Sequence, residues 1–513
     1  MGKRQRLLAT VTAIGLLAVA CGDDDDGADT TSGGDGGATV EGAEIAIALG
    51  SEPTSLDPYL VDDGGERAIN DNIYETLLTR SPEGELQPGL ATELPTQVDD
   101  TTWEFTLRDD VTFHDGTAFN ADSVVASVER IVRLVTNAQT DMDGFFSSIT
   151  GATKVDETTV QVTTAEADAV LPARLYWLKM IAPDAQDADD ISDAPNGTGP
   201  YVFDSYTQGS SLTLTANPDY WGGEPSIGTV DYEFVSEAGT RLAGLISGEY
   251  DLITNLPPQD VEQAPASTQV QGQEHPIVIL NADEGITADP DVRRALNLAV
   301  DKEAIVEQVY GGYAVVDPGQ LISPSIVGFN DDLEPYEYDP EEAQSLIEEA
   351  GVAGETITLV GESSGRWLND RELVEAVASY WTAAGVEVDL QTPGFDEYLD
   401  VLFDRESRAD AIFVSSSNDL LDADRQLSTF YAAGGIGSSN SNEELASLIA
   451  AARTELDPDG RTPIYNEALQ MAYDEAYFVW LVNNEDLYGL SDRMDWEPRV
   501  DAKLLVNEMA VTE

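Results

Sequence analysis

The sequence is poor in cysteine, histidine and positive charge. It contains one Cys and two His in 513 residues, and 25 Lys plus Arg stand against 97 Asp plus Glu, a formal net charge of −72. One Cys excludes a disulfide framework and a cysteine-based zinc site. Two His leave little for metal chemistry, so no metal and no cofactor are expected. The charge also argues against a nucleic-acid partner, since phosphate binding needs a cationic face.

Apolar residues are plentiful enough for large folded cores. Hydrophobic residues make up 42% of the chain, which includes 19 Tyr, 13 Phe and 7 Trp. This composition excludes a disordered acidic protein. At roughly 150 residues per domain, the length predicts about three domain-sized units.

The N-terminus has the pattern of an export signal. Lys3, Arg4 and Arg6 precede the apolar stretch 7–20, which is shorter than the ~20 residues of a membrane-spanning helix. We therefore expect residues 1–20 to be a signal peptide. Small residues directly before the lone Cys21 resemble the lipobox of bacterial lipoproteins, which predicts that Cys21 becomes the lipidated N-terminus. The alternative is an ordinary signal peptide with an incidental Cys.

Residues 21–42 differ in composition from the rest of the chain. Seven acids stand there among Gly, Ser, Thr and Ala, with Val40 as the only large aliphatic residue. Such a segment cannot bury enough apolar surface to fold, and its charges repel one another. It is predicted to be a flexible tether.

The remainder reads as α/β. Residues 44–49, 102–108, 159–163 and 211–215 alternate apolar and polar side chains, as half-buried strands do. Asp289-Pro290 and Asp339-Pro340 each combine an N-cap residue with Pro at the first helical position, which predicts helices starting there. Strands interspersed with such helices favour α/β lobes.

Short motifs along the chain stand in the order typical of one family. They are Tyr74-Glu75-Thr76-Leu77-Leu78, Pro88-Gly89-Leu90-Ala91, Trp103-Glu104-Phe105-Thr106-Leu107-Arg108, Val111-Thr112-Phe113-His114-Asp115-Gly116-Thr117, Gly197-Thr198-Gly199-Pro200-Tyr201 and Asn217-Pro218-Asp219-Tyr220-Trp221. Together they resemble the signature of family 5 solute-binding proteins, the peptide- and nickel-binding components of ABC importers.

The resemblance implies a fold and a division of the chain. The fold is a bilobed, type II periplasmic-binding-protein fold of α/β lobes, with a hinge, a ligand cleft and a subdomain inserted in the first lobe. We expect lobe I at 43–80, 197–272 and 484–513, the inserted subdomain at 81–196, and lobe II at 273–483.

The resemblance also implies a function. We expect an extracytoplasmic lipoprotein on the outer side of the cell membrane, not an enzyme, that captures short peptides and delivers them to ABC permease subunits. We expect it to be a monomer. An oligosaccharide or another solute is the alternative ligand, while nickel is disfavoured because only His114 and His275 are present.

A secreted, lipid-anchored hydrolase is the remote alternative. Residues 361–365 match the G-x-S-x-G pattern of a nucleophile elbow. That fold needs its acid and His downstream of the Ser, whereas His114 and His275 both lie upstream. A Gly/Ser loop between a strand and a helix is the favoured interpretation.

The resemblance places the ligand-binding residues. Asp419 aligns with an Asp that pairs with the peptide α-amino group in relatives, and Ser415, Ser416 and Ser417 precede it where relatives carry Gly-Trp. Asn255 aligns with a position that faces the cleft. Arg366 and Trp367 lie near a segment that supplies a carboxylate-pairing base in dipeptide binders.

Overall fold

The computed structural model describes residues 39–61, 63–189, 191–363, 366–404 and 408–513. The signal peptide, Cys21 and most of the tether lie outside these residues. Within them, no helix combines the length and the apolar character needed to cross a membrane.

The largest sheet has eight strands. Its order is β12 (Ala266–Gln271), β19 (Val482–Leu490), β11 (Leu252–Ile253), β1 (Ala43–Leu49), β10 (Ile227–Phe234), β9 (Ser211–Ala216) and β8 (Tyr201–Thr207), with β14 (Ala314–Val316) also paired to β19. β1 runs parallel to β10 and β11, and the other pairs are antiparallel. We call it the first sheet.

A second sheet has five strands. Its order is β16 (Glu387–Gln391), β15 (Thr356–Val360), β17 (Ala411–Ser417), β13 (Glu274–Leu280) and β18 (Phe478–Trp480). Side chains alternate along β13, which lies between β17 and β18: Ile277 and Ile279 enter one hydrophobic cluster, and Val278 and Leu280 enter another. A strand buried on both faces in this way is typical of a sheet covered by helices on both sides.

Helices cover both faces of the second sheet. One cluster includes side chains of α6 (Pro290–Leu298), α7 (Lys302–Val309), α8 (Pro340–Glu349) and α9 (Asp370–Ala384), and the other includes α10 (Phe395–Phe403), α12 (Glu443–Thr454) and α13 (Pro458–Asp474). α6 and α8 begin where their Asp-Pro pairs predict. Asp289 accepts a hydrogen bond from the Asp291 N–H at 3.0 Å, and Asp339 accepts one from the Glu342 N–H at 3.0 Å.

A third, antiparallel sheet lies between residues 96 and 164. Its order is β4 (Thr96–Asp99), β5 (Thr102–Thr106), β7 (Thr159–Thr164) and β6 (Ile149–Lys154), and α2 (Ala121–Thr136) packs on it. α2 begins with a capping box between Asn120 and Ser123, which satisfies backbone N–H groups that a helix leaves unpaired. The expected lobe boundaries stay a prediction.

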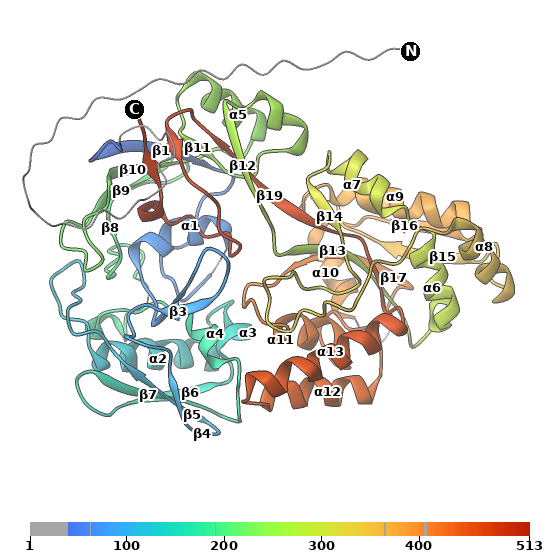
Figure 1. Cartoon of the computed structure of the whole chain (residues 1–513), viewed down its shortest axis with the longest axis horizontal. Helices are drawn as coiled ribbons and strands as arrows, with labels where there is room; N and C mark the ends of the chain where they lie inside the picture. The colour runs from blue at the N-terminus through green and yellow to red at the C-terminus, as the bar shows by residue number, and fades with distance from the viewer. Residues whose placement is uncertain (1–38, 62, 190, 364–365, 405–407) are drawn as a thin grey trace, which may run out of the picture. The chain divides into compact units, whose positions relative to one another are not determined.

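Shorter elements complete the chain. They are α1 (Gly64–Ile73), β2 (Leu78–Arg80), β3 (Leu86–Pro88), α3 (Asp143–Phe146), α4 (Leu171–Leu175), α5 (Ala238–Ser247), α11 (Asp424–Gln426), β20 (Met494–Asp495) and β21 (Ala510–Val511). The chain passes from the first sheet to the second after β12, returns to the first at β14, and returns again between β18 and β19 (Figure 1). The start of β13 and part of β19 line a cavity described below.

Candidate functional site

Two neighbouring cavities lie between elements of the first and second sheets. Their volumes are about 160 Å³ and 370 Å³, and both are lined by Asn255, Arg366, Asp486 and Tyr488. Trp367 lines only the smaller cavity. The structure thus brings the predicted site residue Asn255 together with the adjacent pair Arg366 and Trp367, more than 100 positions further along the chain.

Asn255 presents its side chain at the end of β11. Its backbone is left-handed, with φ of 53°, which Asn tolerates better than most residues because its short side chain bonds locally. Its carbonyl accepts a hydrogen bond from Arg241 Nη2 at 3.1 Å. The buried Arg241 therefore holds this loop in place while the Asn255 side chain stays exposed.

Arg366 and Trp367 lie just before α9. Arg366 is exposed, and its guanidinium carbon stands 4.9 Å from the centre of the Phe395 ring. The Trp367 ring packs edge-on against Tyr398 and Phe413, with ring centres 5.9 and 6.1 Å apart. The Trp is thereby fixed as a wall, whereas the Arg head can turn toward a ligand anion.

Asp419 follows β17 and pairs with a cation of the protein itself. Arg67 Nη1, on α1, lies 3.1 Å from Asp419 Oδ1, and the two side chains are 19% and 17% exposed. Ser417 Oγ donates a hydrogen bond to the same oxygen at 3.2 Å. Burial opposes the charged form, but Arg67 outweighs it and lowers the pKa of Asp419. Asp419 therefore carries a full charge at neutral pH.

Trp177 supports this pair from the other side. The guanidinium carbon of Arg67 lies 4.5 Å from the Trp177 ring centre, and Trp177 Nε1 donates to the Asp419 carbonyl at 2.8 Å. Arg67 lines the larger cavity, whereas Asp419, its ion-pair partner, lines neither of the two cavities. Arg67 was not among the site residues predicted from the sequence. Because bases are scarce in this chain, an Arg next to a Gly-rich helix start is a candidate site residue, and this pattern points to Arg67.

The three serines are less directly placed. Ser415 is buried and forms a hydrogen bond with Glu274, and Ser416 Oγ donates to Gln426 Oε1 at 3.3 Å. Neither these two nor Ser417 lines either cavity. Within the described residues they hold neighbouring polar groups in position.

Acidic side chains gather in the smaller cavity. Glu274 begins β13, and Glu485 and Asp486 lie on β19. Burial, together with the charge of Glu274, raises the pKa of Asp486 to about 7. Burial also raises the pKa of Glu274. This group of acids could not be predicted from the sequence, because acids are abundant throughout the chain.

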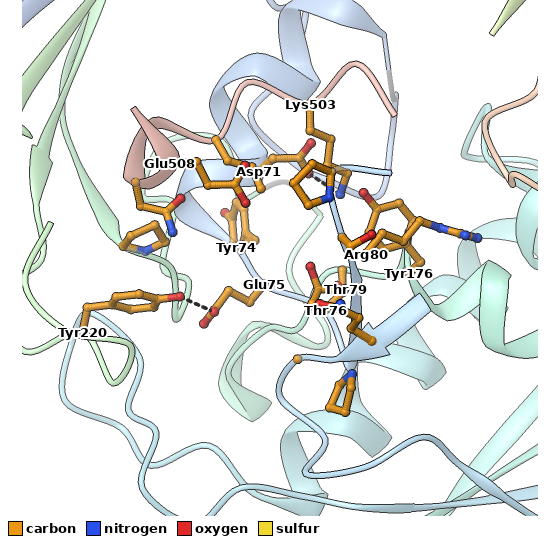
Figure 2. Close-up of a pocket in the computed structure, with 18 of the residues that line it drawn as sticks. Asp71, Tyr74, Glu75, Thr76, Thr79, Arg80, Tyr176, Tyr220, Lys503 and Glu508 are labelled. Carbon is orange, nitrogen blue, oxygen red and sulfur yellow. Dashed lines mark hydrogen bonds and ion pairs between the residues drawn. The ribbon is translucent and has the colours of Figure 1, made fainter. Parts of the chain in front are cut away.

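A third cavity of about 280 Å³ lies away from these residues. Figure 2 shows the side chains of Glu75 and Tyr220 pointing toward each other at this cavity. Glu75 accepts hydrogen bonds from Tyr220 Oη at 2.9 Å, from Trp221 Nε1 at 2.9 Å and from Thr198 Oγ1 at 2.8 Å. Burial raises the pKa of Glu75 to about 7 despite these donors. None of the predicted ligand-binding residues lines this cavity.

Both histidines have protein partners. His275 bonds Asp317 Oδ2 through Nδ1 at 2.7 Å and Ser323 Oγ through Nε2 at 3.1 Å, and His114 Nε2 contacts the Gly199 carbonyl at 3.0 Å. In the part of the chain that the structure describes, no three His, Cys, Asp or Glu side chains form a group able to hold a metal ion.

Known proteins are similar in sequence to this protein over most of its length. The dipeptide-binding protein of Escherichia coli is 28% identical over 482 residues, 86% of this chain and 89% of that protein. Heme-binding protein A of Haemophilus influenzae is 26% identical over 534 residues, 95% of this chain and 96% of that protein.

Solved structures show the same fold. The periplasmic binding protein DppA from Helicobacter pylori, in complex with peptide STSA, matches 92% of this chain and 99% of its own with a TM-score of 0.76 and 24% identity. The substrate-binding protein CtaP from Listeria monocytogenes matches 92% of this chain and 100% of its own with a TM-score of 0.82 and 22% identity. The expected bilobed, type II periplasmic-binding-protein fold is confirmed.

The family follows from the sequence match together with this fold. The family model for the middle part of the bacterial extracellular solute-binding proteins, family 5, matches residues 85–438. Proteins of this family work outside the cytoplasm and bind solutes for ABC importers. The chain belongs to family 5 of the bacterial extracellular solute-binding proteins.

Proposed function

We propose that this protein captures short peptides in the two neighbouring cavities and delivers them to the permease of an ABC importer, without chemically changing them. The observation that carries the proposal is the convergence of Asn255, Arg366 and Trp367 on one space, next to Arg67 and its ion-pair partner Asp419. A base and an acid near one cleft suit the two charged ends of a peptide.

The named relatives support a peptide as the ligand class. The Escherichia coli relative is a dipeptide-binding protein, and the glutathione-binding protein GsiB of Salmonella typhimurium is 25% identical over 460 residues, 86% of this chain. Polar backbone groups around the cavities would bond the peptide backbone and leave room for varied side chains.

Short peptides are expected to raise the melting temperature and to be recovered intact. A ligand that binds only the folded state at 100 times its Kd adds ~2.7 kcal/mol of stability. Differential scanning fluorimetry with tripeptides, followed by mass spectrometry of the mixture and of any ligand that copurifies, makes the measurement. Stabilisation by oligosaccharides but not by peptides would transfer the proposal to the other ligand class. Hydrolysed peptide would support the hydrolase instead.

The anchor is a separate proposal. We propose that Cys21 is the mature N-terminus, carries lipid, and tethers a monomeric binding protein to the membrane through residues 21–42. Stable attachment takes more than one acyl chain, since one gives only marginal binding.

Cys21→Ser is therefore expected to release the protein from the membrane. Fractionation of cells producing each form, with immunoblotting, measures the distribution. The matched control is Ser32→Ala, which changes a hydroxyl in the tether and should leave the protein attached. Membrane retention of the Cys21→Ser form would remove the lipid anchor from the proposal.

A further inference from the structure

The acidic group of the smaller cavity has little positive charge to face. Glu274, Glu485 and Asp486 all line this cavity, and Arg366 is the only basic side chain among its described lining residues. The Arg366 guanidinium lies over the Phe395 ring. Three carboxylates thus share a cavity of about 160 Å³ with one cation, whose charge acts on Glu274.

The three carboxylates are half-buried, and two of them lack the partners that other acids of this protein have. Asp419 pairs with Arg67, and Asp57 pairs with Arg130. Glu274 bonds Ser415, but no described side chain pairs with Asp486, and Glu485 Oε2 is buried without a hydrogen-bond partner. A partly buried charge without a partner is costly, and native proteins normally match it. The missing partner is therefore to be sought in the ligand.

The geometry assigns a second function to this cavity. Asp486 lines both cavities, so a ligand that extends from the larger cavity, which Arg67 lines, into the smaller one meets the carboxylates. We propose that Asp486 and Glu274 receive a cationic side chain of the bound ligand, so that the preferred substrates are short peptides that contain Lys or Arg. This inference rests on the proposed peptide-binding function and names its substrate class.

The electrostatics of the cavity agree with this assignment. Burial and the charge of Glu274 raise the pKa of Asp486 to about 7, and burial raises that of Glu274. A cation placed between the two would favour both charged forms and lower both pKa values. Binding of a basic peptide near neutral pH should then release protons, which binding of a neutral peptide should not.

The test compares peptides that differ only in one charge. Lys is placed at each position of a trialanine in turn, and each peptide is matched by one with uncharged norleucine at that position. Calorimetry on the unmodified protein should show at least one Lys peptide binding about 10-fold or more tightly than its norleucine match. Asp486→Asn keeps the shape and should abolish this preference, measured as the ratio of the Lys and norleucine affinities in the variant.

Glu274→Gln provides a second variant with the same expected loss of preference. Both variants remove repulsion between buried carboxylates, so their melting temperatures should not fall, and this is measured alongside. Equal affinities within all three peptide pairs, or a preference that survives in both variants, would overturn the inference while leaving peptide binding intact. If no peptide binds at all, the proposed function fails together with it.

A pH series gives an independent readout. The charged groups around Asp486 are Glu274, Glu485, Arg366, Arg67 and Asp63, and the further titratable groups nearby are His275 and Tyr488. Because protonation of Asp486 removes its charge, the ratio of Lys to norleucine affinity should fall by about threefold or more between pH ~7.5 and pH ~5.5. The α-amino group is common to both peptides and cancels in the ratio. A ratio independent of pH would contradict the role of Asp486.

Discussion

Asp71→Asn is expected to lower the free energy of unfolding by about 3–5 kcal/mol. Asp71 lies on α1 and pairs with Lys179 and with Lys503, whose Nζ is 3.2 Å from Asp71 Oδ1 (Figure 2). All three side chains are at most 6% exposed. Removing the acid leaves two buried ammonium groups without their counter-charge, and this explains the size of the loss.

The same carboxylate predicts how stability depends on pH. Burial alone would raise the pKa of Asp71, but Lys179 and Lys503 outweigh burial and hold it at about 2. A carboxyl group whose pKa is lower in the folded than in the unfolded state stabilises the folded protein at pH values above its unfolded pKa of ~3.9. This contribution is lost as the pH falls toward 2. The Asp71→Asn protein should lack this part of the acid dependence.

Asp122→Asn is the matched control. Asp122 pairs with Lys154 at 2.9 Å, but the two side chains are 56% and 28% exposed. Exposed pairs contribute at most ~1 kcal/mol, so this variant should unfold close to the unmodified protein. Urea unfolding followed by circular dichroism measures all three. Equal losses in both variants would mean that burial is not what makes the Asp71 group important.

Asp419→Asn is expected to weaken binding of a free-amine peptide by about 2–5 kcal/mol. An ionised carboxylate has acceptor sites for several donors, so Asp419 can bond a ligand ammonium while it holds Arg67. Replacing the carboxylate by an amide keeps the shape but removes the charge from a site with little solvent around it. Isothermal titration calorimetry measures the loss.

The chemical counterpart is acetylation of the peptide N-terminus. Acetylation should weaken binding to the unmodified protein and cost little further in Asp419→Asn, because the two changes remove one interaction. Asp63→Asn is the control variant: it lines the larger cavity, and Asn caps α1 as well as Asp does. An acetylation penalty that is the same in the unmodified and Asp419→Asn proteins would refute the assignment of the amine to Asp419.

Local features were predictable from the sequence because neighbouring residues determine them. The starts of α6 and α8 follow from Asp289 and Asp339 with the Pro after each, and β5 follows from the alternation around Trp103. The family and its fold followed from several ordered motifs. Asn255, Arg366 and Trp367 were then placed by likeness to relatives, and the structure brings them to one space.

Long-range pairs were not predictable in the same way. Arg67 and Asp419 are separated by 352 positions, so no local pattern announces their ion pair. Glu274 and Asp486 come together because β13 of the second sheet contacts β19 of the first sheet. With 97 acids in the chain, composition could not single out these two. Similarly, nothing in the sequence around Ser416 predicts that its hydroxyl donates a hydrogen bond to Gln426.

The place of β19 has a consequence for how the chain reaches its folded state. β19 lies between β12 and β11 in the first sheet, so this sheet is incomplete until residues 482–490 have been made, although β1 is among the first residues to emerge. The second sheet uses only residues 274–480 and can form earlier. Until their distant partner strands have been made, β-strands expose unpaired edges through which chains aggregate. The excess of acids, which gives the whole chain a net charge of −72, makes neighbouring incomplete chains repel each other and so opposes this aggregation.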